Sequence, residues 1–570
     1  MARGIGGIGH TLLSLSVLAV LAGCGGGPGV TQNALPSGSS GSSGSGSNGG
    51  NANPGPSTPT PDGGTTNPGG TNPTTPPINE AIGDLATATA NSAVLTTSRT
   101  DVYNLNTVAL GASGWRPTAL LENINVNLGS ERVNSSPRVA FDAAGNGFAV
   151  WALRDIFVSR YTASTASWST PTVLDVGIDI AHQPRIAIDR PTGNAVVTWT
   201  ESDGVAESRY ATRYNAATNA WSTPELLENS NFPVDGNDEN SAIAIAGSHA
   251  AVAWRQSDGT SMNVYLSRLV NGSWSVPDLI DTDTTPALHP DVAVDLNGNV
   301  TVAWRQQDLL EGYRINTRRW DNTTQSFGPV MPMNNYGERQ HRLQFDAAGN
   351  GFLIWRNGGV FVRQFNVSTG EWTPQIDISA GIGGTVDAEL SVDPAGNAMV
   401  AWVENDAGGI ASMYARRYSA ATGTWGDAEL LENSNVPVNV DLYHTVSMSG
   451  DEAVVAWVEN GAHNDVYAIK MTEGIWGAVT LLETREETAS QLTSAINAAG
   501  NVAVLWQQAD GAQPSVYQAM FQTPNFIVPN GATWQSVANA LYGVNNAEAG
   551  NALQAAMGGG TLNAGDILSG

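Results

Sequence analysis

The sequence predicts a mainly β protein assembled from repeats, and three observations lead to that prediction. Only 14% of its residues are charged, while Gly occurs 64 times and Trp 17 times. Apolar and polar residues alternate in short runs rich in Val, Ile and Phe, which is the pattern of half-buried strands. Turns of the form Asp-x-x-Gly-Asn join these runs, and the whole run–turn–run unit returns along the chain.

The repeated unit is clearest at residues 141–151, which read Phe-Asp-Ala-Ala-Gly-Asn-Gly-Phe-Ala-Val-Trp. Asp favours the first place of a type I turn, and Gly at the fourth can adopt the positive φ that closes a hairpin. The flanking apolar runs are then two paired strands. The Trp that ends the second strand recurs at Trp151, Trp199, Trp254, Trp304, Trp355, Trp402, Trp457 and Trp506.

A second aromatic residue follows each hairpin except the last, after another alternating strand and a small polar turn. These aromatics lie 45 to 53 residues apart, at Trp115, Trp168, Trp221, Trp274, Phe327, Trp372, Trp425 and Trp476. A period near 50 with about four strands per repeat is typical of a β-propeller. The unit at Trp115 has no hairpin before it and the hairpin at Trp506 has no Trp turn after it, so the N-terminal strand should complete the last blade. This count predicts eight blades; seven or nine are the alternatives if a terminal half-repeat stands alone.

The N-terminus has the layout of a signal peptide. Residues 1–23 carry a basic residue, an apolar run and then small residues. The run is too short to span a membrane. The motif Leu-Ala-Gly-Cys that ends at Cys24, the only cysteine, resembles the lipobox of bacterial lipoproteins. The resemblance implies an acylated Cys24 held in a lipid bilayer. Because Gly25 is not the Asp of inner-membrane retention, it also implies the outer membrane, with the body either periplasmic or at the surface.

Composition then divides the remaining chain. Residues 25–80 are almost wholly Gly, Ser, Asn, Pro and Thr, which cannot bury enough apolar surface to offset ordering entropy. They are predicted to be a disordered tether. The four predicted segments are thus the signal peptide and lipobox (1–24), the tether (25–80), the propeller (81–523) and a small C-terminal domain (524–570).

The C-terminal segment changes pattern. Residues 526–538 read as a short strand, a turn and a helix start with Thr533 as N-cap candidate. A second helix is expected over residues 547–557 and a closing strand over residues 562–568. This βααβ order, with Gly-x-Thr-Trp-x-x-Val-Ala-x-x-Leu-Tyr-Gly, resembles a LysM domain, a family that binds N-acetylglucosamine-containing glycans, above all peptidoglycan. The resemblance implies glycan contacts from Gly531, Ala532, Thr533, Leu562, Gly565 and Ile567.

Two features depart from the LysM pattern. Ala532 stands where the family usually has Asp, and the chain stops at Gly570, before the family's Ile-Pro ending. A small docking or capping module is therefore the alternative to glycan binding.

A histidine directly precedes several of the expected innermost strands, and arginines lie close by in the same repeats. The histidines are His182, His289, His341 and His444, and the arginines are Arg138, Arg185 and Arg342. Because innermost strands surround the central channel of a propeller, these side chains are expected near one channel mouth. Such a ring could hold an anion, a sugar acid or a metal. Repeat residues inherited without a function are the alternative.

The acidic turns offer a second candidate site. Asp142, Asp295, Asp346 and Asp393 each begin an Asp-x-x-Gly-Asn turn, which invites a calcium interpretation. Calcium takes six to eight oxygen ligands and its loops usually cluster several acids. One acid per turn falls short, so a folding role is favoured.

An enzyme is the alternative to a binding protein. The turns before the second aromatic distantly resemble the Asp-box of sialidases, Ser-x-Asp-x-Gly-x-x-Trp, although the central Asp is absent here. A channel mouth with facing carboxyls or clustered arginines would favour a glycan-processing enzyme. A mouth lined by Ser, Asn and Gly would disfavour it.

Charge and motifs limit the remaining functions. Lys and Arg number 25 against 52 Asp and Glu, for a net charge of −27, so a phosphate backbone would be repelled and nucleic acid is not an expected partner. No Gly-x-Ser-x-Gly, His-Glu-x-x-His or phosphate-binding loop is present, and no cofactor is expected. The sequence therefore favours a non-catalytic cell-envelope lipoprotein. Its LysM-like module would hold peptidoglycan or another N-acetylglucosamine-containing glycan, and its propeller would present a face to an unidentified protein or glycan.

Overall fold

The structure is a computed structural model. It describes residues 94–96, 102–104, 114–122, 136–563 and 567–569, with gaps at 176, 178, 238–239, 309–311, 335–339, 380, 382–383, 386, 433, 435, 441–443, 462, 484, 512, 524, 529–530, 543–544 and 557–558. The predicted lipidation site Cys24 and the predicted tether lie outside the described residues. No helix in the described ranges is both long and apolar enough to cross a membrane.

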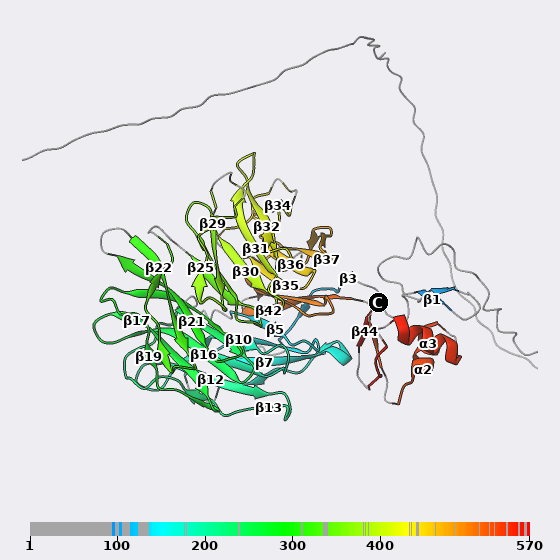
Figure 1. Ribbon diagram of the computed structural model, residues 1–570, viewed down its shortest axis with the longest axis horizontal. Helices are drawn as coiled ribbons and strands as arrows, with labels where there is room; N and C mark the ends of the chain where they lie inside the picture. The colour runs from blue at the N-terminus through cyan, green and yellow to red at the C-terminus, as the bar shows by residue number, and fades with distance from the viewer. Residues whose placement is uncertain are drawn as a thin grey trace, which may run out of the picture. The chain divides into compact units, whose positions relative to one another are not determined.

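Eight five-stranded antiparallel sheets make up most of the described chain, and they are the blades of a β-propeller (Figure 1). Eight blades were predicted, so the alternatives of seven and nine are excluded. Blades are numbered 1 to 8 here from the sheet that contains β5.

The innermost strands of blades 1 to 8 are β5 (Arg138–Phe141), β10 (His182–Ile188), β15 (Ser241–Ala246), β20 (Ala287–Val294), β25 (His341–Phe345), β30 (Ala388–Val392), β35 (Thr445–Ser449) and β40 (Ser490–Ile496). The second strands are β6 (Gly147–Leu153), β11 (Ala195–Ser202), β16 (His249–Ser257), β21 (Val300–Asp308), β26 (Gly351–Arg356), β31 (Ala398–Asn405), β36 (Glu452–Val458) and β41 (Val502–Asp510). The third strands are β7 (Asp155–Thr162), β12 (Glu207–Asn215), β17 (Met262–Val270), β22 (Gly312–Asp321), β27 (Val360–Asn366), β32 (Ala411–Ser419), β37 (Val466–Thr472) and β42 (Gln513–Gln522).

Two short strands share the outer edge of each third strand. The first of each pair is β8 (Ser167–Trp168), β13 (Ala220–Trp221), β18 (Ser273–Trp274), β23 (Ser326–Phe327), β28 (Glu371–Trp372), β33 (Thr424–Trp425), β38 (Ile475–Trp476) and β3 (Gly114–Trp115). The second is β9 (Thr172–Val173), β14 (Glu225–Leu226), β19 (Asp278–Leu279), β24 (Met331–Pro332), β29 (Ile376–Asp377), β34 (Glu429–Leu430), β39 (Thr480–Leu481) and β4 (Ala119–Leu120). The sequence predicted one outer strand. In six blades a Pro such as Pro224, which cannot donate to the ladder, lies at the break, whereas blades 6 and 7 have Gly426 and Gly477 directly after the first short strand and no Pro.

The ring closes as the sequence predicted. β3 pairs with β42, and Trp115 lies opposite Phe521, so the N-terminal strand completes blade 8. Each innermost strand contacts the next, and β40 contacts β5. Closure therefore leaves no blade with an unpaired neighbour and surrounds a central channel with eight strands.

The repeated hairpin Trp forms the core of each blade. All eight are buried, with at most 2% of their surface exposed. In blade 6, Trp402 stacks on Tyr414 of β32 with ring centroids 6.0 Å apart, and its Nε1 donates to Glu404 Oε2 at 2.8 Å. The same bond to a Glu or Gln two residues later occurs at Trp199, Trp254, Trp304, Trp457 and Trp506. A Trp-x-Glu/Gln pattern in the sequence thus marks a buried, satisfied indole.

The C-terminal elements follow the predicted order. They are β43 (Asn525–Ile527), α2 (Trp534–Tyr542), α3 (Ala547–Ala556) and β44 (Ile567–Ser569), and β43 pairs with β44. Val537 and Leu553 are buried between the two helices, where Gly550 contacts the backbone of Gln535. The closing strand begins at Ile567 in the described residues, later than the predicted start at Leu562. A separate short hairpin pairs β1 (Val94–Thr96) with β2 (Val102–Asn104).

Candidate functional site

One end of the central channel, here called the mouth, is where the connections between blades enter the innermost strands. The register defines one equivalent position per blade, opposite the residue that precedes the buried Trp. From blade 1 to blade 8 this mouth ring is Arg138, Arg185, Ala242, Asp291, Arg342, Glu389, Thr445 and Thr493. The surrounding scaffold repeats, but the ring residues differ from blade to blade.

All eight ring residues line a cavity of about 330 Å³ at the mouth. Six of the seven residues predicted for a channel-mouth site are among its lining residues: Arg138, Arg185, Arg342, His289, His341 and His444. Neighbouring strands β5 and β10 contribute two of the arginines. The structure therefore brings most of the predicted set together at one place.

His182 is not among the lining residues. It lies three residues before its ring residue, Arg185, and a bulge separates the two in β10. His289 precedes Asp291 by two residues, whereas His341 and His444 each directly precede their ring residues. His182 instead lies 3.2 Å from the carboxylate of Glu207, measured from Nε2 to Oε2.

Arg342 and Glu389 form a paired charge across neighbouring blades. Arg342 Nε donates to Glu389 Oε2 at 2.9 Å, and a terminal nitrogen donates to Oε1 at 2.5 Å. Their side chains are 29% and 20% exposed to the channel. Burial lowers the pKa of Arg342, but the charges of Glu389, Asp387 and Asp291 outweigh it and raise that pKa above its ordinary value. The guanidinium is thus fixed in place as a cation.

Asp291 lies on the other side of Arg342 in the ring. Its Oδ2 accepts the backbone N–H of Leu343 at 2.7 Å, and its Oδ1 accepts that of Val292 at 2.9 Å. Burial raises the pKa of Asp291 to about 6, against the opposing effects of these bonds and of Arg342. Asp291 can therefore exchange a proton near neutral pH. Sequence reasoning missed both this acid and Glu389.

The buried histidines differ in their surroundings. His341 is 4% exposed and its ring nitrogens make no hydrogen bond, although the Ala303 carbonyl lies near the ring. Burial, helped by His289, holds the pKa of His341 well below its ordinary value, so this ring is neutral at pH 7. His444 Nε2 donates to the Ala401 carbonyl at 3.1 Å, and its Nδ1 lies 3.7 Å from Asp387 Oδ2. Burial raises the pKa of Asp387, with a further contribution from Glu389.

Left-handed backbone conformations recur at one position of the mouth. In four blades, the residue two places before the ring position has a positive φ: Ser136 (36°), Gln183 (56°), His289 (50°) and Gln491 (57°). Each is a non-glycine residue in a left-handed conformation, which costs about 1–3 kcal/mol. Three of them precede proline in the motifs Ser-Pro-Arg, Gln-Pro-Arg and His-Pro-Asp. This repeated X-Pro-Arg/Asp motif is the sequence signal that could have located Asp291.

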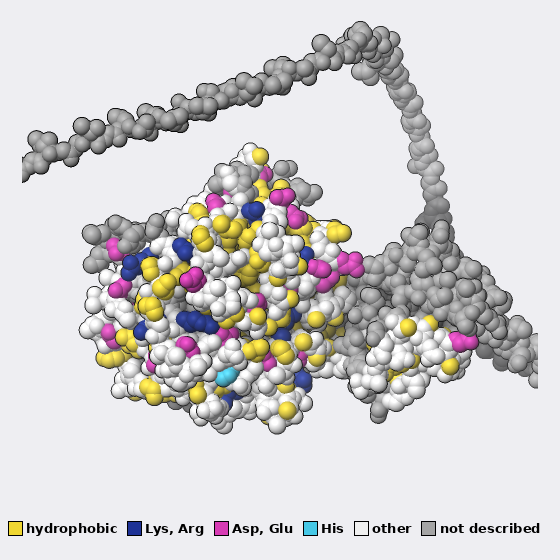
Figure 2. All heavy atoms as spheres, in the orientation of Figure 1, with side chains coloured by type: hydrophobic (Ala, Val, Ile, Leu, Met, Phe, Trp, Pro, Cys, Tyr) yellow, Lys and Arg dark blue, Asp and Glu magenta, His cyan; other side chains and the backbone are white. Residues whose placement is uncertain are grey.

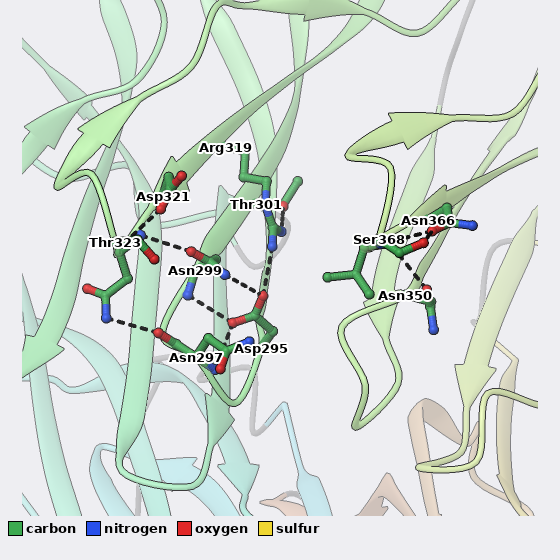
Figure 3. A network of polar contacts seen from close by, with 12 residues as sticks. Asp295, Asn297, Asn299, Thr301, Arg319, Asp321, Thr323, Asn350, Asn366 and Ser368 are labelled. Carbon is green, nitrogen blue, oxygen red and sulfur yellow. Dashed lines mark hydrogen bonds and ion pairs between the residues drawn. The ribbon is translucent and has the colours of Figure 1, made fainter.

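The opposite end of the channel, here called the turn face, carries the Asp-x-x-Gly-Asn turns (Figure 3). Asp295 Oδ1 accepts the N–H groups of Asn297 and Asn299 at 3.0 and 2.9 Å. Its Oδ2 accepts from Arg319 at 2.7 Å. Asn299 Oδ1 in turn accepts the N–H of Asn322, which ties this turn to the next one.

The same Asn-to-turn bond occurs in six blades, with its donors at Ala163, Ala216, Asn322, Val367, Ala420 and Thr523. The predicted turn residues Asp142, Asp346 and Asp393 likewise accept the N–H of an Asn four residues on. Within the described parts of the chain, no three His, Cys, Asp or Glu side chains are grouped so as to hold a metal ion. The geometry favours the folding role of these acids.

The residues predicted for the LysM-like groove lie around the start of α2 and the end of the chain. Thr533 Oγ1 accepts the N–H of Ser536 at 3.1 Å, and Ser536 Oγ accepts that of Thr533 at 2.8 Å, so Thr533 caps the helix as predicted. Gly531 and Ala532 precede it, and Leu562 lies in the segment after α3. Gly565 lies outside the described residues. Ile567 belongs to β44, and glycan binding by this set stays a prediction.

On the face that Figure 2 shows, surface charge does not single out another site. In Figure 2, the charged side chains of both signs on the visible face of the propeller are scattered among neutral and apolar ones. The mouth, with three arginines around one cavity, is therefore the candidate site that the structure defines best.

No known protein family matches this sequence. No curated protein matches it either. Among solved structures, the polysaccharide lyase Uly1 is 12% identical, with a TM-score of 0.37, and the match covers 58% of this chain and 88% of that one. The NanB sialidase from Streptococcus pneumoniae is 9% identical, with a TM-score of 0.32 and 71% of each chain covered. A leech intramolecular trans-sialidase is 10% identical, with a TM-score of 0.31, and 73% of this chain and 71% of that one are covered. At these scores none of them assigns an activity to this chain.

Proposed function

We propose that this protein is a non-catalytic binding lipoprotein of the cell envelope, and that its channel mouth binds an anionic sugar of a glycan partner. The acylated Cys24 would anchor the chain in the outer membrane. The LysM-like module would attach it to peptidoglycan, and the propeller would present its mouth to the partner.

The observation that carries the proposal is the composition of the mouth. Arg138 and Arg185 lie at equivalent positions of adjacent strands and line one cavity with Arg342. Arg is suited to carboxylates because its planar group donates two parallel hydrogen bonds. Thr445, Thr493 and Gln491 line the same cavity and offer hydrogen bonds to sugar hydroxyls. A sugar acid combines both kinds of group.

Two weak attachments would act together in this arrangement. The lipid anchor and the peptidoglycan-binding module are on the same chain, so each attachment raises the effective concentration of the other. Modest glycan affinity in the C-terminal module would then be enough to place the protein.

The mouth can be tested by calorimetric titration with tri-galacturonic acid, a small uronic-acid oligosaccharide. We expect residues 25–570 to bind it. The Arg138→Gln, Arg185→Gln double variant should bind at least about tenfold more weakly, since each hydrogen bond between an arginine and a ligand carboxylate contributes about 1.5–3 kcal/mol. Arg213→Gln is the matched control, because Arg213 pairs with Glu225 on the outer strands of blade 2. Equal binding by all three proteins would remove the mouth from the proposal.

The anchor can be tested by co-sedimentation with purified peptidoglycan sacculi. We expect residues 25–570 to pellet and residues 25–524 to stay in the supernatant. If both stay in the supernatant, the C-terminal module is a cap or a docking module.

A glycan-processing enzyme is the second candidate. The observation in its favour is that the mouth holds clustered arginines and two carboxyls, Asp291 and Glu389, on either side of Arg342. The raised pKa of Asp291 is also typical of an acid–base group. Turnover of uronic-acid glycans or aryl-glycosides that is lost in Asp291→Asn would favour the enzyme. Binding without turnover would favour the binding protein.

A further inference from the structure

Behind the mouth ring the channel continues into a second cavity of about 520 Å³, here called the bore. Asp291, Arg342 and Glu389 line both cavities, so mouth and bore are successive segments of one channel. Small side chains line much of the bore, including Ala140, Ala187, Ala244, Ala293, Ser391, Ser447 and Ser494. The bore is therefore wide behind the charged ring.

Arg190 lies at the turn-face end of the bore. It belongs to the turn between β10 and β11, whose sequence Asp-Arg-Pro-Thr-Gly-Asn is one residue longer than the other Asp-x-x-Gly-Asn turns. The corresponding residues are Ala143, Leu296, Ala347 and Pro394 in those turns, and Ala498 in the Asn-x-x-Gly-Asn turn of blade 8. Among these six turns, the turn of blade 2 is the one that places a long polar side chain at this point.

The side chain of Arg190 reaches across the channel. Its terminal nitrogen donates to Ser449 Oγ at 3.0 Å and to the Ile496 carbonyl at 3.3 Å. These acceptors end the innermost strands of blades 7 and 8, whereas Arg190 follows that of blade 2. Burial lowers the pKa of Arg190, opposed by the nearby charge of Asp393 in blade 6. Arg remains a cation in proteins, so the bridge carries a positive charge.

We infer that Arg190 closes the turn-face end of the channel, so that the mouth receives the end of a glycan chain and not an internal segment. This inference rests on the proposed function of the mouth. A channel open at both ends could thread a polymer, but a blind channel can take in only a terminal group, because the rest of the chain must leave by the way it entered. Arg190 would then determine the preference for chain ends by blocking the channel, without contacting the sugar bound at the mouth.

Closure can be tested without any ligand by thiol labelling. The full chain with Cys24→Ser has no cysteine, so Ala187→Cys places a single thiol in the bore. The mouth is then narrowed with Thr493→Trp, or with Thr445→Trp if the first variant does not fold, as judged by circular dichroism. We expect narrowing to slow methanethiosulfonate labelling at least about tenfold, because a thiol reacts only where the reagent reaches it. Adding Arg190→Ala should restore the rate. Unchanged labelling in the narrowed variant with Arg190 present would overturn closure.

End recognition can be tested by titrating the full chain with galacturonic acid oligomers of increasing length and with the long polymer. If only ends bind, we expect the same Kd for every length when the ligand concentration is counted in chain ends. When it is counted in sugar residues, Kd should rise in proportion to chain length. A constant Kd per sugar residue would overturn the inference, because internal segments would then bind. If no galacturonate binds, the proposed function fails and end recognition fails with it, while the labelling result still decides whether the channel is closed.

Discussion

The mouth and the turn face of the propeller are made by the same eight repeats, yet they differ in how uniform they are. On the turn face, an Asn side chain accepts the same backbone N–H in six blades. At the mouth, the equivalent ring position holds three arginines, two acids, two threonines and one alanine. The turn face thus has the same hydrogen bond in most blades, whereas the mouth has a different side chain at the equivalent position of most blades.

This difference separates residues whose hydrogen bonds repeat from blade to blade from residues whose partners change from blade to blade. Turn-face carboxylates use their oxygens on backbone N–H groups, which every blade needs to satisfy. Ring residues line the channel and have different partners: Asp291 accepts two backbone N–H groups, whereas Glu389 binds Arg342. The predictions that follow test this division, from the largest expected effect to the smallest.

Among these variants, Asp295→Ala on the turn face should lower the free energy of unfolding most. It leaves the N–H groups of Asn297 and Asn299 without their acceptor and Arg319 without its carboxylate. We expect a loss of about 2–3 kcal/mol in the free energy of unfolding, measured in urea, because the buried Asp295 carboxylate is the shared acceptor of these partly buried donors and of Arg319. Binding at the mouth should not change. An unaffected stability would show that the repeated turn bonds are dispensable.

Asp291 should make stability depend on pH. Its folded-state pKa is raised to about 6, so its contribution is complete below the unfolded pKa of about 4 and is lost as pH rises through about 6. We expect wild type to lose about 2 kcal/mol relative to Asp291→Asn between pH 4 and pH 7. Thermal unfolding at a series of pH values measures this. Parallel curves for the two proteins would contradict the assignment.

Glu389→Gln and Glu225→Gln compare an ion pair at the mouth with one on the outer strands. Glu389 holds Arg342 by two hydrogen bonds at 20% exposure, whereas Glu225 is 35% exposed in its pair with Arg213. We expect Glu389→Gln to cost about 1–2 kcal/mol and Glu225→Gln less than about 0.5 kcal/mol, since solvent screens the second pair. Denaturant titration of both variants tests this, and equal losses would contradict it.

Gln491→Gly should have the smallest effect, and with the opposite sign. The positive φ of Gln491 strains a residue with a Cβ, and Gly removes that strain. We expect a gain of up to about 1 kcal/mol in stability, together with weaker ligand binding, because the cavity loses the Gln491 side chain. A loss of stability would show that the mouth backbone is not strained.

Much of the fold was predictable from local pattern. The hairpin Trp residues and the Asp turns depend on neighbours within one repeat, and the unpaired ends at Trp115 and Trp506 are the two halves of one repeat; together they predicted eight closed blades. The split outer strand was not predicted, although Pro224 and its equivalents mark the break. At the mouth, His289, His341 and His444 were predicted just before the inner strands; His289 and His341 lie within β20 and β25, and all three line the mouth cavity. Asp291 and Glu389 were not predicted, because their relation to Arg342 joins residues about 50 positions apart.

The sequence by itself determined the repeat, the turn chemistry, the buried Trp core and the closure of the ring, since these depend on periodicity and on contacts within or between adjacent repeats. It also carries the lipobox and LysM resemblances, which stay predictions. Only the tertiary structure decided which side chains share the mouth cavity, that His182 lies outside it, and that Arg190 reaches the ends of blades 7 and 8. Those relations depend on how eight twisted sheets meet around one axis, and no local pattern specifies that geometry.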